Sequence, residues 1–399
     1  MPPRKKEDSR VSEDMSSSST KVRVIVRDDD SLLGKKMPEK SIKFVVVGGT
    51  LEVANTLRRI LLSEVVTVAP VYDQYNLQDP SKNDVVITAN TTALHDQIMG
   101  VRISMIPIHM SRIRISTHER SELKFVLDSV NKKDLPVDVT TEDVKIYDAD
   151  GSPLPTAQTS TYLPPDPFTG DYPIIARLKP LEVFKAEFYG RRTIARENPR
   201  CSPVSTCAMS YVVDEKLAKA DLDARLAAEP PENHDQIREH HRSIDRQRCY
   251  QVDEIGEALE IAFHVESECG MSAADVVLSA FDVMLGKIDA LERNMRVRGA
   301  HKDDPAFFHV DLEDEDHSMG NLYQAMCFRL YPKELDYIGY MMPHPQVRHV
   351  VFKIKLARGE EGGEDEETRL DAFLARSRGD IRAHVERVRQ TFSEAVGTL

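Results

Sequence analysis

The segment LEVANTLRRILLSEVVTV, residues 51–68, constrains the fold more than any other because its apolar surface is too wide for a helix that buries one side. On a helical wheel the apolar residues fill an arc of about 140°, whereas packing on one sheet requires a stripe of roughly 100°. The residues of this arc are Val53, Ala54, Leu57, Ile60, Leu61 and Val65. Thr50 precedes them as a candidate N-cap. We therefore expect this helix to contact a second body as well as its own sheet.

Composition excludes several classes of protein. The chain has 399 residues and a formal net charge of −13, which argues against a stand-alone nucleic-acid-binding protein. Its five cysteines are scattered without CxxC spacing, which predicts free thiols in an intracellular protein and no structural zinc or iron–sulfur site. The first ten residues lack the apolar core of a secretory signal, and no apolar run approaches the length of a membrane span.

The first two-thirds of the chain predict an α+β unit that is interrupted by an insert. Residues 1–20 are polar and serine-rich, and we expect them to be disordered. Strand patterns on both sides of a proline-rich, β-rich stretch predict a discontinuous dimerisation domain, residues 21–71 and 186–298, with an insert domain at 72–185. The charged segment 214–250 is partly helical in pattern and is expected to be exposed.

The same order of elements returns, in shorter form, after a predicted linker at residues 299–305. Residues 306–399 contain a strand pattern, a helix that Ser318 is predicted to cap, a second β segment and, after an acidic loop at 360–367, a long helix. Both long helices carry an apolar stripe that is typical of a helix pair. The stripes are Val277, Phe281, Met284, Ile288, Leu291 and Met295 in one helix, and Leu370, Phe373, Leu374, Ile381, Val385, Val388 and Phe392 in the other. The duplication predicts two α+β units that pair within one chain, with Ala54-Asn55 equivalent to Gly320-Asn321.

Several motifs resemble a known family. VANTLRRILLSEVVTVA is similar to the first helix of the family that contains the alpha subunit of bacterial RNA polymerase, its archaeal D-type counterpart and the third-largest subunit of eukaryotic RNA polymerase II. NTTALHDQIMGVRISMIPI, residues 90–108, resembles the segment that opens the insert domain of that family, and SPVSTCAMSY and LEIAFHVES follow in the expected order. Many relatives carry metal-binding cysteines in this insert. This chain has no cysteine between residues 1 and 200, so the resemblance implies no metal or other cofactor here.

The last hundred residues resemble the smaller partner of that family, which is the L-type protein of archaea or the eleventh eukaryotic subunit. The matching motifs are EDHSMGNL, residues 315–322, and GYMMPHP, residues 339–345. Tyr323 and Gln324 depart from the Leu and Arg that are usual in that family. Both partners on one chain resembles the fused subunit of some large DNA viruses of eukaryotes. The resemblance thus implies a viral factory or virion as the location if the source is viral, and the nucleus otherwise.

The resemblance implies a non-catalytic assembly platform of a multisubunit DNA-dependent RNA polymerase. Its partners would be the second-largest and largest subunits and small zinc-binding subunits, with no direct nucleic-acid readout and no membrane contact. The candidate interface residues are Val53, Ala54, Asn55, Leu57, Arg58, Arg59, Ile60, Leu61, Val65, Asp316, His317, Met319, Gly320, Asn321, Leu322, Met326, Pro343, His344 and Pro345.

The polar residues of this set have alternative interpretations. Arg58 and Arg59 are either solvated charges or, for Arg59, a contact for a larger polymerase chain and, for Arg58, a cation that needs a carboxylate or carbonyl partner. Asn55 and Asn321 are either surface residues or bind backbone where two helices approach closely.

Two competing functions remain open from sequence alone. One is a metal-dependent hydrolase built around His95, Asp96, His317 and His344. We disfavour it because adjacent His and Asp residues do not face each other on a helix or strand, and because Pro343 and Pro345 explain the second motif as a fixed loop. The other is a promoter-binding transcription factor, which the acidic net charge disfavours.

Overall fold

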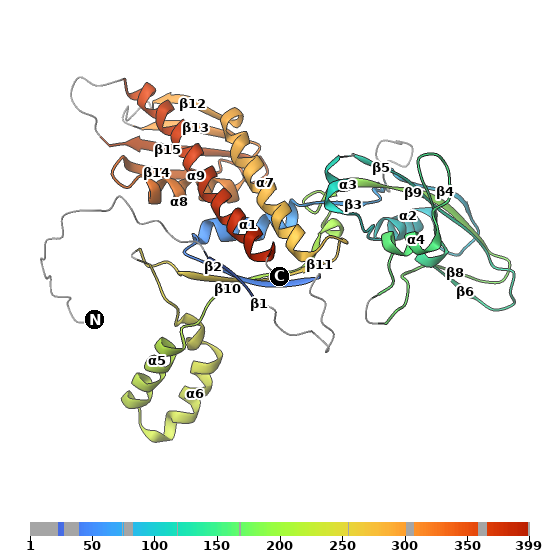
Figure 1. Ribbon diagram of the computed structural model, residues 1–399, viewed down its shortest axis with the longest axis horizontal. Coiled ribbons are helices and arrows are strands. Elements are labelled where there is room, and N and C mark those ends of the chain that lie inside the picture. The colour runs from blue at the N-terminus through green and yellow to red at the C-terminus, as the bar shows by residue number, and fades with distance from the viewer. Residues whose placement is uncertain are drawn as a thin grey trace, which may run out of the picture.

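The computed structural model describes most of the chain as a mixed α+β protein (Figure 1), which confirms the predicted fold class. The described residues are 23–27, 40–73, 75, 83–117, 119–166, 169–253, 255–300, 307–357 and 365–397. The predicted disordered tail lies outside this range, as do residues 301–305 of the predicted linker and 360–364 of the acidic loop. Within the described range, no helix combines the length and the apolar character needed to cross a membrane.

The first sheet is antiparallel and contains strands from distant parts of the chain. Its order is β1 (Arg23–Arg27), β2 (Ser41–Val47), β11 (Glu260–Ser267) and β10 (Val204–Tyr211). Every second residue of β11 is buried, so one face of the sheet packs on the core. Helices α1 (Leu51–Ser63) and α7 (Ala273–Asn294) contact this sheet.

Helix α1 begins where the sequence predicts but ends earlier. The side chain of Thr50 caps it by accepting a hydrogen bond from the backbone N–H of Val53. The helix stops at Ser63, and Val66–Ala69 form strand β3 instead of another helical turn. The prediction of helix to residue 68 was therefore wrong, because the β-branched run from Val65 to Val68 favours a strand and pairs with β9.

The second sheet is also antiparallel and has the order β12 (Met295–Ala300), β13 (Phe308–Glu313), β15 (His349–Leu356) and β14 (Leu335–Met341). Helices α8 (His317–Leu330) and α9 (Glu366–Gly397) belong to this part of the chain. Strand β12 follows α7 directly and pairs with β13. The structure therefore changes sheets at residue 295, ahead of the linker predicted at residues 299–305.

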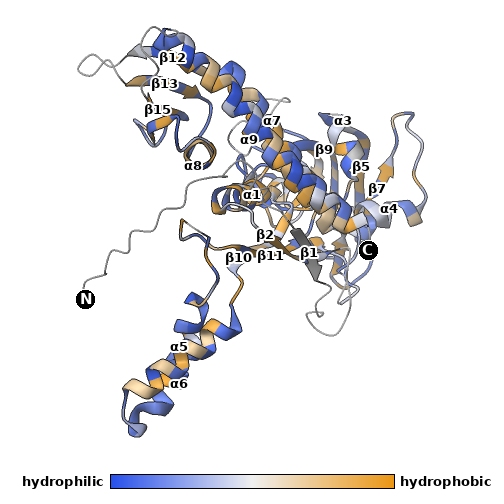
Figure 2. Ribbon diagram, turned by 60° about the vertical axis from the view of Figure 1, so that its left-hand side comes forward, coloured by the Kyte–Doolittle hydropathy of each residue, from blue (hydrophilic) through white to orange (hydrophobic). Residues whose placement is uncertain are grey.

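The two long helices α7 and α9 lie side by side between the sheets in both views (Figures 1 and 2). All residues of both predicted apolar stripes are buried, which confirms the helix-pair prediction. Near the end of α9, the ring of Phe392 lies 4.9 Å from that of Phe44 in β2, and Phe44 stacks on Phe263 of β11 at 4.8 Å. The last helix of the chain therefore packs into the core of the first sheet.

The insert domain is built on a five-stranded antiparallel sheet and a two-stranded sheet. The larger sheet contains β3, β4 (Val85–Asn90), β5 (Arg120–Val130), β7 (Lys145–Tyr147) and β9 (Val183–Ile194), and the smaller one contains β6 (Val137–Thr140) and β8 (Ile174–Leu178). Short helices complete the domain: α2 (Asp96–Ser104), α3 (Arg112–Thr117) and α4 (Thr156–Tyr162). Because β3 and β9 pair here, the insert sheet extends beyond the predicted bounds of 72–185 on both sides.

The predicted exposed segment 214–250 forms a helical hairpin. It contains α5 (Glu215–Ala228) and α6 (His234–Ser243), followed by the 3₁₀ turn η5 (Asp245–Arg248). The hairpin stands away from the rest of the molecule in both views (Figures 1 and 2).

Candidate interface between the two halves

We call the part from β1 to α7 the first half and the part from β12 to α9 the second half. Helices α1 and α8, one from each half, pack side by side in opposite directions. At one end, the hydroxyl of Thr50 lies 3.6 Å from Sδ of Met326, near the end of α8. Further along α1, the buried hydroxyl of Thr56 donates to the carbonyl oxygen of Ser318, in the first turn of α8, at 3.4 Å. The two helices that the sequence analysis treats as equivalent therefore contact each other directly.

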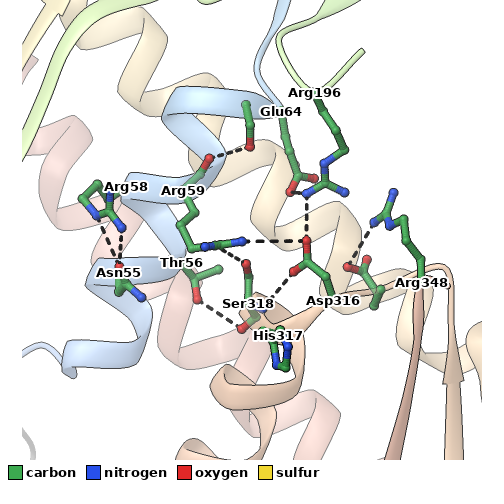
Figure 3. Close-up of polar contacts among 12 residues, drawn as sticks. Asn55, Thr56, Arg58, Arg59, Glu64, Arg196, Asp316, His317, Ser318 and Arg348 are labelled. Carbon is green, nitrogen blue, oxygen red and sulfur yellow. Dashed lines mark hydrogen bonds and ion pairs between the residues drawn. The ribbon is translucent and has the colours of Figure 1, made fainter. Parts of the chain in front are cut away.

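Arg59 extends this contact at the start of α8 (Figure 3). Its Nε donates to Oγ of Ser318 at 2.6 Å, and its guanidinium lies 4.0 Å from the carboxylate of Asp316. Asp316, and not Ser318 as predicted, caps α8 by accepting from the Ser318 N–H at 2.8 Å. The polar face of α1, which we expected to be open to a larger polymerase chain, is thus partly occupied by α8.

A group of mostly buried charges continues from this contact into the interior. Lys287 of α7 lies 2.7 Å from Oε2 of Glu64 in the first half and 3.0 Å from Oε2 of Glu315 in the second half. Arg196 pairs with Glu64 and also contacts Asp316 at 3.2 Å. Arg348 approaches Glu315 to 3.7 Å (Figure 3). These five residues and Asp316 form what we call the charge network, which joins the two halves.

The pKa values of the acidic residues show which charges depend on their partners. Burial raises the pKa of Glu315, and the attraction of Lys287 offsets only part of this effect. Burial would also raise the pKa of Asp316, but hydrogen bonds from Ser318 and the nearby Arg196 and Arg59 hold it below its usual value. Lys287 is therefore the main group that favours the charged form of Glu315.

Comparison with known families identifies the fold that carries this contact. Residues 43–288 match the RNA polymerase Rpb3/Rpb11 dimerisation domain. The chain belongs to this family.

Relatives of this Rpb3-like chain come from plants, amoebae and archaea. It is 23% identical over 304 residues to the DNA-directed RNA polymerases IV and V subunit 3B of Arabidopsis thaliana, covering 64% of this chain and 88% of that protein. It is 23% identical over 290 residues, 63% of this chain and 78% of the relative, to the DNA-directed RNA polymerases I and III subunit rpac1 of Dictyostelium discoideum. Subunit Rpo3 of Thermococcus kodakarensis is 35% identical over 108 residues, 27% of this chain and 33% of that protein. The protein is an Rpb3-like, non-catalytic assembly subunit of DNA-directed RNA polymerase.

Most apolar residues of the candidate set are buried in the hydrophobic core. They are Val53, Ala54, Leu57, Ile60, Leu61 and Val65 in and after α1, and Met319, Gly320, Leu322 and Met326 in α8. Gly320 has a specific steric role, since a Cβ there would lie 2.7 Å from the ring of Tyr340 in β14. The small residue of this motif therefore allows α8 to approach its own sheet.

The polar residues of the candidate set differ in their exposure and in their partners. Asn55 accepts from Nε and Nη2 of Arg58, at 3.2 and 2.9 Å, so Arg58 has a side-chain amide as its partner. Asn321 is exposed and does not bind backbone between the helices. His317 is exposed at the start of α8, with Nδ1 3.3 Å from the hydroxyl of Tyr340. The exposed loop between β14 and β15 contains Pro343, His344 and Pro345.

The two departures from the family pattern, Tyr323 and Gln324, make contacts within the second half. The fully buried hydroxyl of Tyr323 lies 2.6 Å from Oγ of Ser377 in α9. Gln324 accepts from the backbone N–H of Tyr340 at 3.0 Å. Both residues therefore attach α8 to the rest of its own half.

The residues of the hydrolase hypothesis do not assemble into a site. His95 and Asp96 begin α2 in the insert domain, where Asp96 accepts from Asn90 at 2.8 Å. His317 and His344 are exposed in the second half. Within the described residues, none of these four belongs to a cluster of ligand atoms that could hold a metal.

Sequence reasoning missed five members of the charge network, although two of them, Glu64 and Glu315, lie within the quoted motifs; the other three are Arg196, Lys287 and Arg348. In sequence, Lys287 lies beside the apolar stripe of α7, between Met284 and Ile288. A charged residue close to such a stripe is the one signal that could have indicated a buried ion pair.

Proposed function

We propose that residues 306–399 supply, on the same chain, the smaller partner with which an Rpb3-like subunit pairs. The observation that carries this proposal is the antiparallel contact of α1 and α8, closed by bonds from Thr56 and Arg59 to Ser318. The fusion makes pairing intramolecular, at an effective concentration of about millimolar. Platform formation then no longer depends on the encounter of two chains.

We further propose that the candidate set divides between two interfaces. Its buried residues and Arg59 belong to the contact between the halves, together with the charge network. Its exposed residues Asn321, His344 and the flanking Pro343 and Pro345 are available to other subunits. In this proposal the domains are the discontinuous first unit, the insert domain and the smaller second unit, with the change of sheet at β12 as the junction.

The partners in this proposal are the largest and second-largest subunits and small zinc-binding subunits of the polymerase. The insert domain offers them two exposed apolar side chains at α2. Ile98 lies in the first turn of α2, Met105 is the C-cap residue directly after it, and they are 47% and 63% exposed. Exposed apolar groups on one element are typical of a surface that another protein covers.

Co-expression with the two largest subunits tests the role of these two side chains. We expect the double substitution Ile98→Asp and Met105→Asp to reduce recovery of those subunits on the tagged chain, because it places two charges in an apolar contact. The matched control is Leu135→Asp, which changes another exposed apolar side chain of the same domain. Equal recovery with all three chains would refute the role of α2.

A viral source is the last part of the proposal. It is supported by the presence of both halves on one chain, which resembles fused subunits of large DNA viruses. The protein would then act in viral factories or be packaged in the virion. Detection of this chain among the proteins of purified particles would support this assignment, and its presence only in the nuclear polymerase of a cellular organism would contradict it.

A further inference from the structure

The hairpin of α5 and α6 has almost no apolar interior. From residue 215 to residue 249, the buried side chains are Ala218, His241 and Asp245. Apart from the turns that flank α6, the two helices pack chiefly on each other. A unit of this size with so small a core usually needs a cross-link, a bound metal or a partner to hold its shape.

Polar ligand atoms occupy the place where the apolar core would be. One ligand atom each comes from Asp221 of α5, His241 of α6 and Cys249, directly after η5, and these atoms lie within 4.8 Å of one another. Nε2 of His241 is 3.4 Å from Oδ2 of Asp221. It is buried without a hydrogen-bond partner, and the His241 side chain is only 6% exposed. A buried imidazole nitrogen without a hydrogen bond requires an explanation, and a bound cation is one that suits its neighbours.

We propose that Asp221, His241 and Cys249 bind one divalent transition-metal ion of the zinc type. Thiolate, imidazole and carboxylate are the usual zinc ligands, and three protein ligands with an open fourth position form a tetrahedral site. Asp221 and Cys249 are only half-buried, so water can reach that fourth position. On binding, the thiol of Cys249 loses its proton to solvent, and the resulting thiolate and the carboxylate balance the two charges of the ion.

The surrounding charges are compatible with such an ion. Arg225 donates to Oδ2 of Asp221 at 2.7 Å, but it also donates to Oδ2 of Asp245 at 3.0 Å. Nδ1 of His240 lies 2.7 Å from the same oxygen of Asp245. The thiol of Cys249 donates to the carbonyl oxygen of Asp245 at 3.5 Å. The positive charge of Arg225 is thus shared by a second carboxylate, which limits its repulsion of a cation.

No sequence motif indicated this site, because its residues come from three elements with no local spacing. The site is independent of the proposed function, since it lies in a hairpin that takes no part in the contact between the halves. A metal here would stabilise the hairpin in place of an apolar core and would fix the angle between α5 and α6.

Cobalt titration of the full chain, stripped of metal by a chelator, tests the proposal. We expect one equivalent of Co²⁺ to bind with thiolate-to-cobalt charge-transfer absorption, and Zn²⁺ to abolish that absorption by displacement. The substitutions Cys249→Ser and His241→Gln should each remove it. The matched control Cys207→Ser, at a half-buried cysteine of β10, should retain it. Absorption that is absent from the natural chain, or unchanged by Cys249→Ser, would overturn the proposal.

Hydrogen exchange gives a second measurement that does not depend on the absorption of bound cobalt. We expect Zn²⁺ to slow amide exchange in α5 and α6 of the natural chain but not in the conservative variant Asp221→Asn, while exchange in α7 and α9 stays the same in both. Exchange in the hairpin that is unaffected by Zn²⁺ would also overturn the proposal.

Discussion

The ammonium of Lys287 lies 2.7 Å from the carboxylate of Glu64. The same ammonium is 3.0 Å from Glu315, so one cation from α7 is shared by a carboxylate that follows α1 and one that precedes α8. All three side chains are at most 13% exposed. Because the two carboxylates belong to different halves, Lys287 neutralises a repulsion that pairing of the halves would otherwise create.

Lys287→Met should therefore be strongly destabilising. It leaves two buried carboxylates facing each other, and loss of one partner from a buried ion pair costs about 3–5 kcal/mol in the free energy of unfolding. Urea denaturation at pH 7 measures this effect. The triple variant with Glu64→Gln and Glu315→Gln should recover part of the loss, because it removes the repulsion between the two carboxylates. A single variant as stable as the natural chain would show that the network is not needed.

Two helical glycines should respond to alanine with opposite signs. At Gly320 an added Cβ would lie 2.7 Å from the ring of Tyr340, and we expect Gly320→Ala to destabilise the protein by about 1–3 kcal/mol through overpacking. At Gly286 in α7, nothing lies within 4 Å of the added Cβ. Gly286→Ala should stabilise it by roughly 0.5–1 kcal/mol, since alanine has the higher helix propensity. Thermal unfolding of the two variants checks both signs, and destabilisation at both positions would contradict the steric argument at Gly320.

The sequence predicted those parts of the fold in which apolar residues recur at regular spacing. The stripes of α7 and α9 were predicted from the helical spacing of their apolar residues. All of these residues, from Val277 to Phe392, are buried in the structure. The strand β3 was missed because Val65 and Val68 continue the arc of α1 and no glycine or proline separates them from the helix. Pairing with β9, more than a hundred residues away, determines its conformation.

The polar contacts between the halves could not be predicted in the same way. Arg59 was expected to be solvated or to contact a larger polymerase chain, yet Ser318 binds both Arg59 and the neighbouring Thr56. Likewise, lysine and glutamate are usually found on protein surfaces, and only their neighbours in the fold distinguish Lys287 and Glu315 from such surface residues. Pairing of buried polar groups depends on tertiary position, which no local pattern encodes.

His384 in α9 should make the protein less stable in mildly acidic solution. Burial lowers its pKa from 6.5 to about 4, and Arg387 and Arg329 contribute to the same shift. The native state thus keeps this imidazole neutral, while the unfolded chain protonates it below pH 6.5. Its contribution is complete above that pH and is lost as the pH falls toward 4.

Denaturation at pH 7 and pH 5 measures this loss. Between these values we expect the free energy of unfolding of the natural chain to fall by about 2 kcal/mol more than that of His384→Leu. The exposed His344→Leu is the matched control and should follow the natural chain. Glu315, whose pKa is raised by burial, titrates in all three chains and cancels from the comparison. Equal pH dependence for the natural chain and His384→Leu would refute the assignment to His384.

Cutting the chain between β12 and β13 should leave the two resulting fragments bound to each other. A protease site placed within residues 301–306 would separate two fragments that still share the β12–β13 pairing and the α1–α8 and α7–α9 contacts. We expect them to co-elute after cleavage without denaturant. Their unfolding should become dependent on protein concentration, because association then contributes to stability. At micromolar protein, loss of an effective concentration of about millimolar corresponds to about 4 kcal/mol.

The double variant Arg59→Ala with Thr56→Val tests whether the contact between α1 and α8 holds the fragments together. It removes the bonds to Ser318 without altering the apolar core of either half, so the cut fragments should separate at lower urea than those of the natural chain. The matched control is Leu135→Asp in the insert domain, which should leave the separation unchanged. Natural fragments that part as soon as the chain is cut would mean that the linker, and not the surfaces of α1 and α8, holds the platform together.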